Sequence, residues 1–275
     1  MSVYPIIHTQ QFNDEGYLVI KNVFTPKEIE HFRAVIYQQA EIDKANKRVR
    51  TAGEVIYGVG DFLSKKELND LVFDDRIVNI FKKTLGENLV YFGDSNYQIG
   101  GRLTGFHRDM HNSKNYDAPE WQGDYTLARM GIYLQDHSIH SGGLKIRIGS
   151  HKNPSGKPVF CNTEVGDVVV WNMRTLHSGN AVKLKLFPNL SIFNSVGKEK
   201  IVPNFLQKSH EKERLAMFIS YALPSVHYER FKTANAQEAV YQSTLANSKF
   251  DFDAAFQKAK SKGIFLDKLH PEFGN

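Results

Sequence analysis

Apolar and polar residues follow two different periods along this chain, one typical of helices and one typical of strands. Over residues 26–45 the apolar positions fall on one helical face, formed by Ile29, Phe32, Ile36 and Ala40. Thr25 begins this segment as a capping box, because Glu28 follows three residues later and a proline takes the first helical position. A second helix is predicted over about 74–85, where Gly86 marks its end.

Short apolar runs separated by Gly, Asp, Asn and Ser replace this pattern from residue 88 onward. The runs predict strands, and they are VYFGDSNYQI, YTLARMGIYLQD, GLKIRI, VGDVVVWNM and RLAMFISYAL. Between 127 and 135 the residues alternate, so one face holds Ala128, Met130, Ile132 and Leu134 and the other holds Arg129, Gly131, Tyr133 and Gln135. An apolar face under helices and a more polar inner face are typical of a ligand-binding barrel or jelly roll.

The two ends of the chain carry mixed patterns. Residues 12–24 predict a turn at 14–16 and then a short apolar strand, and helices return after about residue 234. We find no internal repeat, low-complexity tract or linker, so a single domain over residues 1–275 is the simplest prediction. Its parts are a mixed helical segment, a jelly-roll core and C-terminal helices, over residues 1–87, 88–225 and 226–275.

Charge and cysteine content narrow the classes of partner. The net charge is +5, but the basic residues are scattered, which favours a small molecule, an anionic one included, over nucleic acid. The single cysteine, Cys161, excludes an internal disulfide, and we expect it to be buried and inert in a reducing compartment. The first residues lack a signal-peptide pattern and no apolar run could span a bilayer, so we expect a cytoplasmic protein.

Candidate metal ligands stand in two segments. On an extended chain, residues two apart point the same way, so His107 and Asp109 of GGRLTGFHRDMH can bind one ion from one face. His177 follows a strand-like run in GDVVVWNMRTLHSGN. Two imidazoles and one carboxylate on one face of an iron ion leave three positions open. Zinc accepts the same ligands, as in a hydrolase, so the residue types alone leave the metal open.

The order and spacing of several blocks resemble the phytanoyl-CoA dioxygenase (PhyH) family of Fe(II)/2-oxoglutarate-dependent oxygenases. The blocks are FNDEGYLVIKNVFTPKEIEHFR, FDDRIVNIFKKTLGENLVYF, FHRDMH, GGLKIRIGSHK and GDVVVWNMRTLHSGN. The resemblance implies a mainly β fold, a double-stranded β-helix (jelly roll, cupin-like) with flanking helices. It also implies His107, Asp109 and His177 as ligands of Fe(II), with 2-oxoglutarate as cosubstrate and O2 as the oxidant.

The same resemblance implies an arginine, on the strand after the distal histidine, that binds the far carboxylate of the oxo-acid. A planar guanidinium matches a carboxylate bidentately. This chain departs from the family pattern, because the residues just after His177 offer Lys183 and Lys185 but no arginine. Arg214 opens the run that resembles the arginine-bearing strand, so we interpret residues 181–213 as an insertion and Arg214 as the anchor, with the two lysines as rivals.

Further side chains are weaker candidates. Asn96 and Gln98 share one strand face and either bind the oxo-acid or act as structural amides. We expect a structural role for His151. Candidates for the substrate pocket are His111, Arg129, Tyr133 and Trp171, and the histidines expected in loops are His137, His140 and His210.

The predicted reaction is hydroxylation, or another oxidation, of a small or medium polar metabolite with release of succinate and CO2. Asp109 fills the ligand position that halogenases of this superfamily leave vacant, which favours oxygen transfer over chlorination. The alternatives are a zinc-dependent hydrolase on the same ligands and a non-catalytic jelly-roll binding protein. The insertion 181–213 is rich in apolar residues and lysines, which predicts a substrate lid or, as its rival, a subunit interface in a homo-oligomer.

Overall fold

The computed structural model describes residues 7, 9–102, 104–153, 155–191, 196–238, 242–243 and 246–267. The helices are α1 Thr9–Glu15, α2 Pro26–Ala45, α3 Asp75–Thr84, α4 Val196–Lys200, α5 Val226–Asn235 and α7 Phe252–Ser261. Short 3-10 helices cover Phe62–Ser64, Asn69–Phe73, Pro119–Trp121 and Asn204–Leu206. The strands are β1 Tyr17–Ile20, β2 Val49–Ala52, β3 Val55–Gly58, β4 Val90–Tyr91, β5 Ser95–Ile99, β6 Leu127–Tyr133, β7 Leu144–Arg147, β8 Pro158–Cys161, β9 Val168–Asn172, β10 His177–Ser178, β11 Leu215–Ala222 and β12 Phe265–Leu266.

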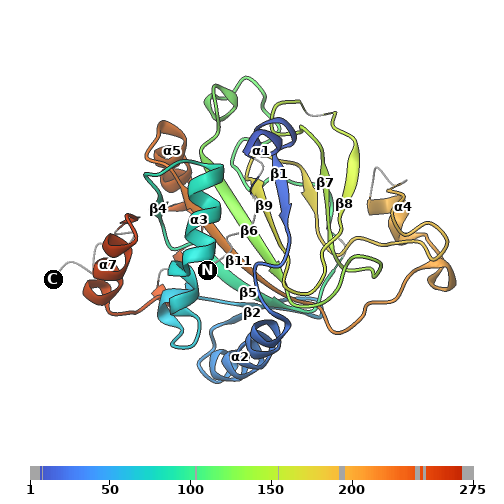
Figure 1. Ribbon diagram of the computed structural model, residues 1–275, viewed down its shortest axis with the longest axis horizontal. Helices are drawn as coiled ribbons and strands as arrows, with labels where there is room; N and C mark the ends of the chain where they lie inside the picture. Colours follow the sequence, from blue (N-terminus) through green and yellow to red (C-terminus); the bar gives the residue numbers. More distant parts are fainter. Residues whose placement is uncertain are drawn as a thin grey trace.

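Two sheets form the body of the fold (Figure 1). The larger sheet has the strand order β1-β9-β6-β11-β5-β3-β2, and β4 pairs with β11 and β12 at its side. The smaller sheet has the order β10-β7-β8. Among the described strands, every pairing is antiparallel except that of β12 with β4. This is the predicted mainly β, jelly-roll architecture with flanking helices.

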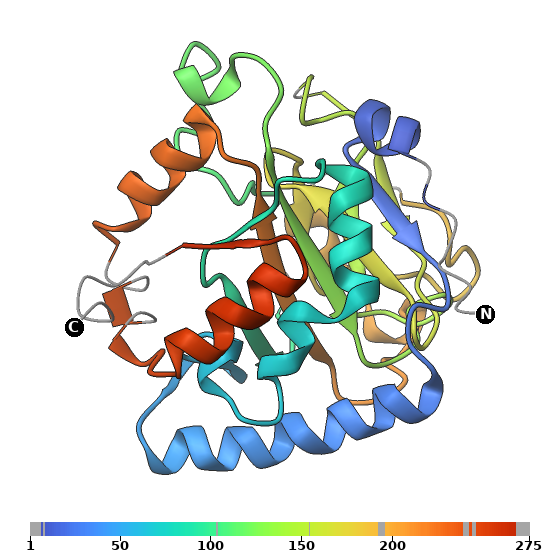
Figure 2. The same ribbon diagram turned by 60° about the vertical axis from the view of Figure 1, so that its left-hand side comes forward.

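Helices cover one face of the larger sheet, as Figures 1 and 2 show for α3 and α7. The main apolar core lies between this face and the helices. It joins Ile77, Ile80 and Phe81 of α3 to Ala128, Met130 and Ile132 of β6 and to Leu134, which follows β6. The opposite face of the same strand carries Arg129 and Tyr133, which line cavities between the sheets. The alternation along 127–135 therefore separates a helix-covered core from a polar interior, as predicted.

Local signals predict the first two long helices correctly. The Thr25 hydroxyl accepts a hydrogen bond from the Glu28 backbone N–H, and the Glu28 carboxylate accepts one from the Thr25 N–H, which completes the capping box of α2. α3 follows Asp74, whose side chain accepts from the Arg76 N–H. Gly86 has φ 136°, a conformation that glycine adopts readily and that ends the helical path.

Three details differ from the sequence prediction. Residues 9–15 form α1 rather than leading into a simple turn, and Gly16, with φ 82°, ends that helix before β1. The hairpin β2–β3 and the strand β8 are additional to the predicted elements. The helices expected after about residue 234 are α5, which begins earlier at Val226, and α7, while the positions between 238 and 246 lie mostly outside the described residues.

None of the helices in the described part of the chain combines the length and the apolar character that crossing a bilayer requires.

Candidate metal centre and its cavities

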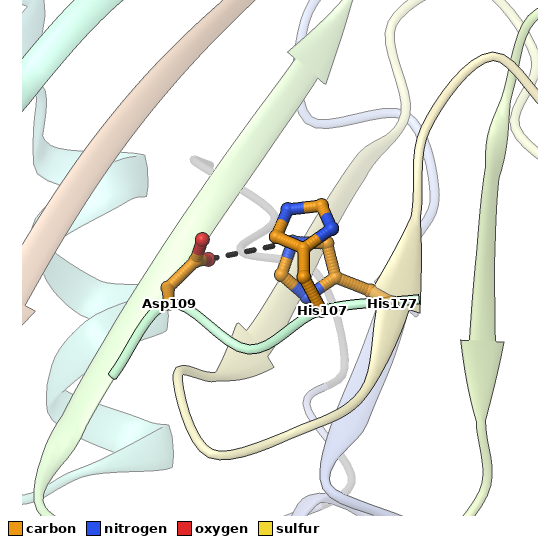
Figure 3. A group of neighbouring side chains, drawn as sticks. All are labelled: His107, Asp109 and His177. Atoms are coloured by element: carbon orange, nitrogen blue, oxygen red, sulfur yellow. Dashed lines mark ion pairs between the residues drawn. The ribbon is translucent and has the colours of Figure 1, made fainter. Parts of the chain in front are cut away.

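The backbone brings the two candidate histidine ligands together. His107 and His177 are paired in an isolated antiparallel bridge, in which each backbone N–H donates to the other carbonyl at 2.9 Å. The Asp109 N–H donates to the Met173 carbonyl at 3.0 Å, so the whole His-x-Asp segment lies along the chain that leads into β10. This pairing of segments far apart in the sequence places the three side chains on one side (Figure 3).

Both imidazoles are oriented by backbone carbonyls. His107 Nδ1 lies 2.8 Å from the Gly105 oxygen, and His177 Nδ1 lies 3.0 Å from the Thr175 oxygen. A carbonyl only accepts, so each Nδ1 carries the proton and each Nε2 has its lone pair free for a metal. One donor atom from each of His107, Asp109 and His177 lies within 4.8 Å of the others, which suits a single bound ion.

The two oxygens of Asp109 have different surroundings. Oδ2 lies 3.5 Å from His177 Nε2 and accepts a hydrogen bond from Trp171 Nε1 at 3.1 Å. Oδ1 lies 3.0 Å from Nη1 of Arg129. Figure 3 shows the carboxylate turned toward the two rings. Oδ2 is therefore available to a metal ion, while Oδ1 is held by the guanidinium of Arg129.

The protonation states fit metal binding. Burial alone would raise the pKa of Asp109, but the charges of Arg129 and of the two histidines outweigh it and lower the pKa to about 2. Burial lowers the pKa of His177 to about 4, against the opposing effect of Asp109. At neutral pH the carboxylate is therefore ionised and the His177 ring is neutral, which are the forms that bind metals.

A cavity of about 320 Å³, here called the inner cavity, opens directly from the three ligands. Arg214 lies in its wall, 6% exposed, where Nε donates to the Gly142 carbonyl at 3.0 Å and Nη1 donates to Gln98 Oε1 at 3.4 Å. Within the described part of the chain no carboxylate forms an ion pair with Arg214. A buried cation without a counter-charge is costly, so this cavity suits an anionic ligand.

Three further polar atoms in the inner cavity are buried and have no hydrogen-bond partner among the described residues. They are Asn96 Oδ1, Tyr133 Oη and Asn180 Oδ1. Buried polar groups normally have partners, and those that lack one commonly face a ligand or water. Gly101 keeps this wall compact, because a Cβ there would lie 2.7 Å from both Arg214 Cδ and Asn180 Oδ1. The Tyr133 hydroxyl can donate to a carboxylate of an oxo-acid, whereas the two amide oxygens only accept and can face water or a hydroxyl group.

The rival anchors lie elsewhere. Lys183 is buried, but its Nζ donates to the Ser138 carbonyl and to Asn162 Oδ1, each at 2.6 Å. Lys185 is not fully buried, and neither lysine lines the inner cavity. The geometry thus favours Arg214 over both lysines, although its role as the oxo-acid anchor stays a prediction.

A second cavity, of about 680 Å³ and here called the outer cavity, adjoins the first. The two share Arg50, Tyr57, Asn96, Asp109 and Arg129 in their linings. The predicted substrate-pocket residues divide between them: His111 lines the outer cavity, Tyr133 and Trp171 line the inner one, and Arg129 lines both.

The insertion 181–213 packs beside the smaller sheet. Its helix α4 places the buried Glu199 against Lys145 of β7, and none of its described residues lines either cavity. Several of its apolar side chains are exposed, namely Leu186, Phe187, Leu190, Ile201, Phe205 and Leu206. Ile192 and Phe193 lie outside the described residues. A lid or interface role for this segment stays a prediction.

Cys161 and His151 have structural surroundings. Cys161 is buried, and burial raises the pKa of its thiol far above the usual range, which makes it a poor nucleophile. His151 Nε2 lies 3.0 Å from the Asn13 carbonyl, which ties this histidine to α1.

The three loop histidines differ in burial. His137 lies in a loop, as expected, but is only 1% exposed, with Nε2 2.7 Å from Gln135 Nε2 and Nδ1 3.1 Å from the Ser141 carbonyl. His140 and His210 also lie in loops and are more accessible. His137 is therefore part of the folded core rather than of the surface.

Several residues of the site escape sequence analysis. Arg50 and Tyr57 come from the hairpin β2–β3, although Gly53 between two short β-prone runs is a usable turn signal. Asp94 holds Arg129, and Asn180 lines the inner cavity from a backbone with φ 55°. No local pattern marks Asp94 and Asn180, because only the folded chain brings them to the metal ligands.

Solved structures with similar folds include several oxygenases. The carbocyclase SnoK from nogalamycin biosynthesis, described as dependent on non-haem iron and α-ketoglutarate, matches with a TM-score of 0.54 and 20% identity, over 81% of this chain and 88% of that chain. EctD from S. alaskensis, solved with 2-oxoglutarate and 5-hydroxyectoine, matches with a TM-score of 0.55 and 15% identity, over 81% of this chain and 78% of that chain. At these identities the likeness supports the jelly-roll fold alone.

Two comparisons at the level of sequence, with a relative and with a family model, identify the family of this chain. An ectoine dioxygenase of Nocardia farcinica (strain IFM 10152) is 28% identical in an alignment 169 residues long that covers 55% of this chain. The aligned part spans about half of that relative, 53% of its length. The model of the family described as phytanoyl-CoA dioxygenase (PhyH) matches residues 12–183, which include all three candidate metal ligands. The chain therefore belongs to the phytanoyl-CoA dioxygenase (PhyH) family.

Proposed function

We propose that this protein is an Fe(II)- and 2-oxoglutarate-dependent dioxygenase that oxidises a small or medium polar metabolite. In the overall reaction a substrate C–H bond becomes C–OH, and 2-oxoglutarate is converted to succinate and CO2. One atom of O2 enters the new hydroxyl group and the other enters succinate. The observation that carries the proposal is the buried Arg214, for which the described residues supply no counter-charge, beside a His/Asp/His cluster. Family membership and the fold are consistent with it.

His107, Asp109 and His177 would hold the metal through two Nε2 atoms and Oδ2. Bound iron, together with the oxo-acid, supplies the oxidising power that the protein side chains lack. The backbone carbonyls behind both imidazoles fix the rings, and the Trp171 N–H holds the ligand oxygen of Asp109 in place. Outer contacts of this kind commonly contribute roughly 10- to 100-fold to metal affinity.

Arg214 would bind the far carboxylate of 2-oxoglutarate. Its Nε and Nη1 are used by protein acceptors, which fixes the plane of the guanidinium and leaves its remaining edge to the cavity. Along the same wall the Tyr133 hydroxyl can donate to the oxo-acid, while the amide oxygens of Asn96 and Asn180 can accept from water or from a substrate hydroxyl. In this proposal Gln98 positions Arg214, because its amide oxygen accepts from Nη1.

The outer cavity would take the substrate. It adjoins Asp109, so a molecule bound there lies next to the metal ligands, while Leu144, Trp171 and Phe218 give the inner cavity an apolar side that limits water. The mixed polar lining of the outer cavity suits a polar metabolite better than a long hydrocarbon chain. Its volume of about 680 Å³ accommodates a ligand of small to medium size.

A zinc hydrolase on the same ligands is the second candidate, because zinc also binds two histidines and a carboxylate. Hydrolysis does not require a buried arginine in the inner cavity whose charge the described residues leave unpaired. Succinate formation separates the two reactions. Purified protein should release succinate from 2-oxoglutarate in air with Fe(II) and ascorbate, faster when a substrate is present, and zinc should inhibit this reaction by competing for the site. Hydrolysis that depends on zinc, without succinate release, would favour the hydrolase.

A further inference from the structure

The two cavities together carry more positive charge than their proposed occupants neutralise. Among the described residues, their linings contain six basic side chains, Lys47, Arg50, Arg102, Arg108, Arg129 and Arg214, and three carboxylates, Asp94, Asp109 and Glu238. This inference rests on the proposed function. In that function Fe(II) and the 2-oxoglutarate dianion add charges of equal size and opposite sign, which cancel. A cationic surplus therefore remains for the substrate.

Local contacts show which cations are already used. Arg129 is held by Asp94 and Asp109, and Arg108 donates to three backbone carbonyls. The exposed Lys47 lines the outer cavity alone, and the carboxylate of Glu238 in the same lining offsets its charge.

Apart from the oxo-acid anchor Arg214, two basic side chains remain, Arg102 and Arg50, and they differ in position. Arg102 is exposed and lines the inner cavity alone. Arg50 is exposed on β2 and lines both cavities, and within the described part of the chain no ion pair or hydrogen bond holds its guanidinium. A molecule that reaches from one cavity to the other therefore passes Arg50.

Tyr57 restrains this arginine. The Cζ of Arg50 lies 4.4 Å from the centre of the Tyr57 ring, and the two residues are partners across the strands β2 and β3. Stacking on an aromatic ring restrains a guanidinium and leaves its N–H groups free for an oxyanion in the plane.

The sheet register fixes where Arg50 lies relative to the reaction. Arg50 pairs with Tyr57, Tyr57 with Gln98, and β5 continues the row into β11. Arg50 thus lies at the outer end of a row of cross-strand neighbours. Gln98, in the same row, accepts a hydrogen bond from Arg214. It stands at the junction of the two cavities, with the ligand Asp109 in their shared lining.

We propose that Arg50, restrained by Tyr57, binds an anionic group of the substrate, a carboxylate or a phosphate, and so selects anionic metabolites. A substrate held by its anion at the junction extends from Arg50 toward the metal ligands, and a neutral or cationic analogue lacks this contact. Arg50 is then a specificity-determining residue, separate from the oxo-acid anchor Arg214.

Binding without turnover tests this assignment. Protein saturated with Fe(II) and 2-oxoglutarate under anaerobic conditions is titrated, by isothermal calorimetry, with four probes on one phenylalkyl skeleton: 3-phenylpropionate, 2-phenylethyl phosphate, 3-phenylpropionamide and 3-phenylpropylammonium. We expect the two anions to bind at least about tenfold more tightly than the amide and the ammonium, because hydrogen bonds to a charged partner are the stronger ones. The carboxylate and phosphate arms show which anion the site prefers.

Variants decide whether Arg50 is responsible. Arg50→Gln should weaken anion binding by about 10- to 100-fold and leave amide binding unchanged, whereas Arg50→Lys should retain part of the preference. Arg230→Gln is the matched control, because Arg230 lies on α5 and lines neither cavity. The affinity for 2-oxoglutarate is measured for each variant in the same way.

Three results would overturn the proposal: equal binding of the amide and the anions by the unaltered protein, full anion affinity in Arg50→Gln, or a loss confined to 2-oxoglutarate. The last would move Arg50 into the oxo-acid site. Because the readout is binding, it is independent of the proposed reaction. Anion capture through Arg50 in a protein that forms no succinate would keep this inference and refute the dioxygenase, and succinate formation without anion preference would do the opposite.

Discussion

Nη1 of Arg129 lies 3.0 Å from Oδ1 of Asp109, the carboxylate oxygen that does not face His177. The same guanidinium is fixed at its other atoms, since Nε donates to Ser220 Oγ at 2.9 Å and Nη2 lies 2.5 Å from Asp94 Oδ2. One oxygen of Asp109 is therefore committed to a cation, which leaves the other for a metal. This contact gives the carboxylate a single binding orientation.

Loss of this contact should weaken metal binding. Arg129→Met should reduce the affinity for Fe(II), or for Co(II) as a stable substitute, by roughly 10- to 100-fold, as expected for a second layer of contacts around a metal ligand. Asp94→Asn should have a smaller effect in the same direction, because it loosens Arg129 without removing it. Competition with a chromophoric chelator measures both, with circular dichroism to check folding. Unchanged affinity in the well-folded Arg129→Met protein would show that Asp109 needs no such support.

Arg214 should control the requirement for 2-oxoglutarate. Removing one member of a buried charge pair costs about 2–5 kcal/mol, so Arg214→Gln should raise the dissociation constant of the oxo-acid by about 30-fold to several thousand-fold. Metal affinity should change little, because the hydrogen bonds of Arg214 go to residues other than the three metal ligands. Lys183→Gln is the control, since its Nζ binds Ser138 and Asn162. A larger effect in Lys183→Gln than in Arg214→Gln would assign the anchor to the lysine.

The capping box of α2 provides a test of local stability. Thr25→Ala removes the side-chain acceptor of the Glu28 N–H and should lower the free energy of unfolding by about 1 kcal/mol. Thr233→Ala serves as the comparison, because Thr233 is exposed within α5 and is not its N-cap. Urea unfolding of both variants gives the difference. Equal effects would mean that the cap contributes nothing beyond the loss of a hydroxyl.

His137 should make the protein less stable in acid. Burial lowers its pKa to about 3, with a further contribution from Arg214, whereas the ordinary value, expected in the unfolded chain, is 6.5. Between these two values only the unfolded state takes up the proton, so stability falls as the pH drops below the unfolded pKa. The loss should reach about 2 kcal/mol at a pH of about 5.

The variant His137→Gln isolates that contribution. Its free energy of unfolding should depend less on pH between about 7 and 5 than that of the unaltered protein, by about the same 2 kcal/mol. Denaturant unfolding at both pH values measures the difference. Parallel curves for the two proteins would mean that His137 takes up its proton at the same pH in the folded and unfolded states.

Sequence patterns predict the elements whose causes are local. The capping box of α2, the end of α3 at Gly86 and the alternation along β6 depend on neighbouring residues, and the structure confirms each of them. The segment before β1 forms a helix instead of a simple turn, because nothing in 9–15 distinguishes a short helix held by packing from a turn. The hairpin β2–β3 carries a turn signal at Gly53 but too little alternation to stand out.

The candidate site is predictable in part. Residue types and family resemblance point to His107, Asp109 and His177, which the backbone bridge then brings within reach of one another. The sequence analysis places Arg129 in the substrate pocket but does not predict its contact with Asp109. That contact depends on the register between strands, which no sequence pattern reveals. Arg50 escapes prediction for the same reason, because only the pairing of β2 with β3 and of β3 with β5 brings it to the cavities.

The most direct test of the dioxygenase assignment is an anaerobic titration of the Fe(II)-loaded protein with 2-oxoglutarate, followed by visible absorption. Binding of the oxo-acid to iron held by His107, Asp109 and His177 should produce a weak charge-transfer band that saturates with the oxo-acid. Asp109→Ala should lose the band, because one of the three protein ligands is gone. The absence of a band in the unaltered protein, together with tight zinc binding and hydrolytic activity, would contradict the assignment.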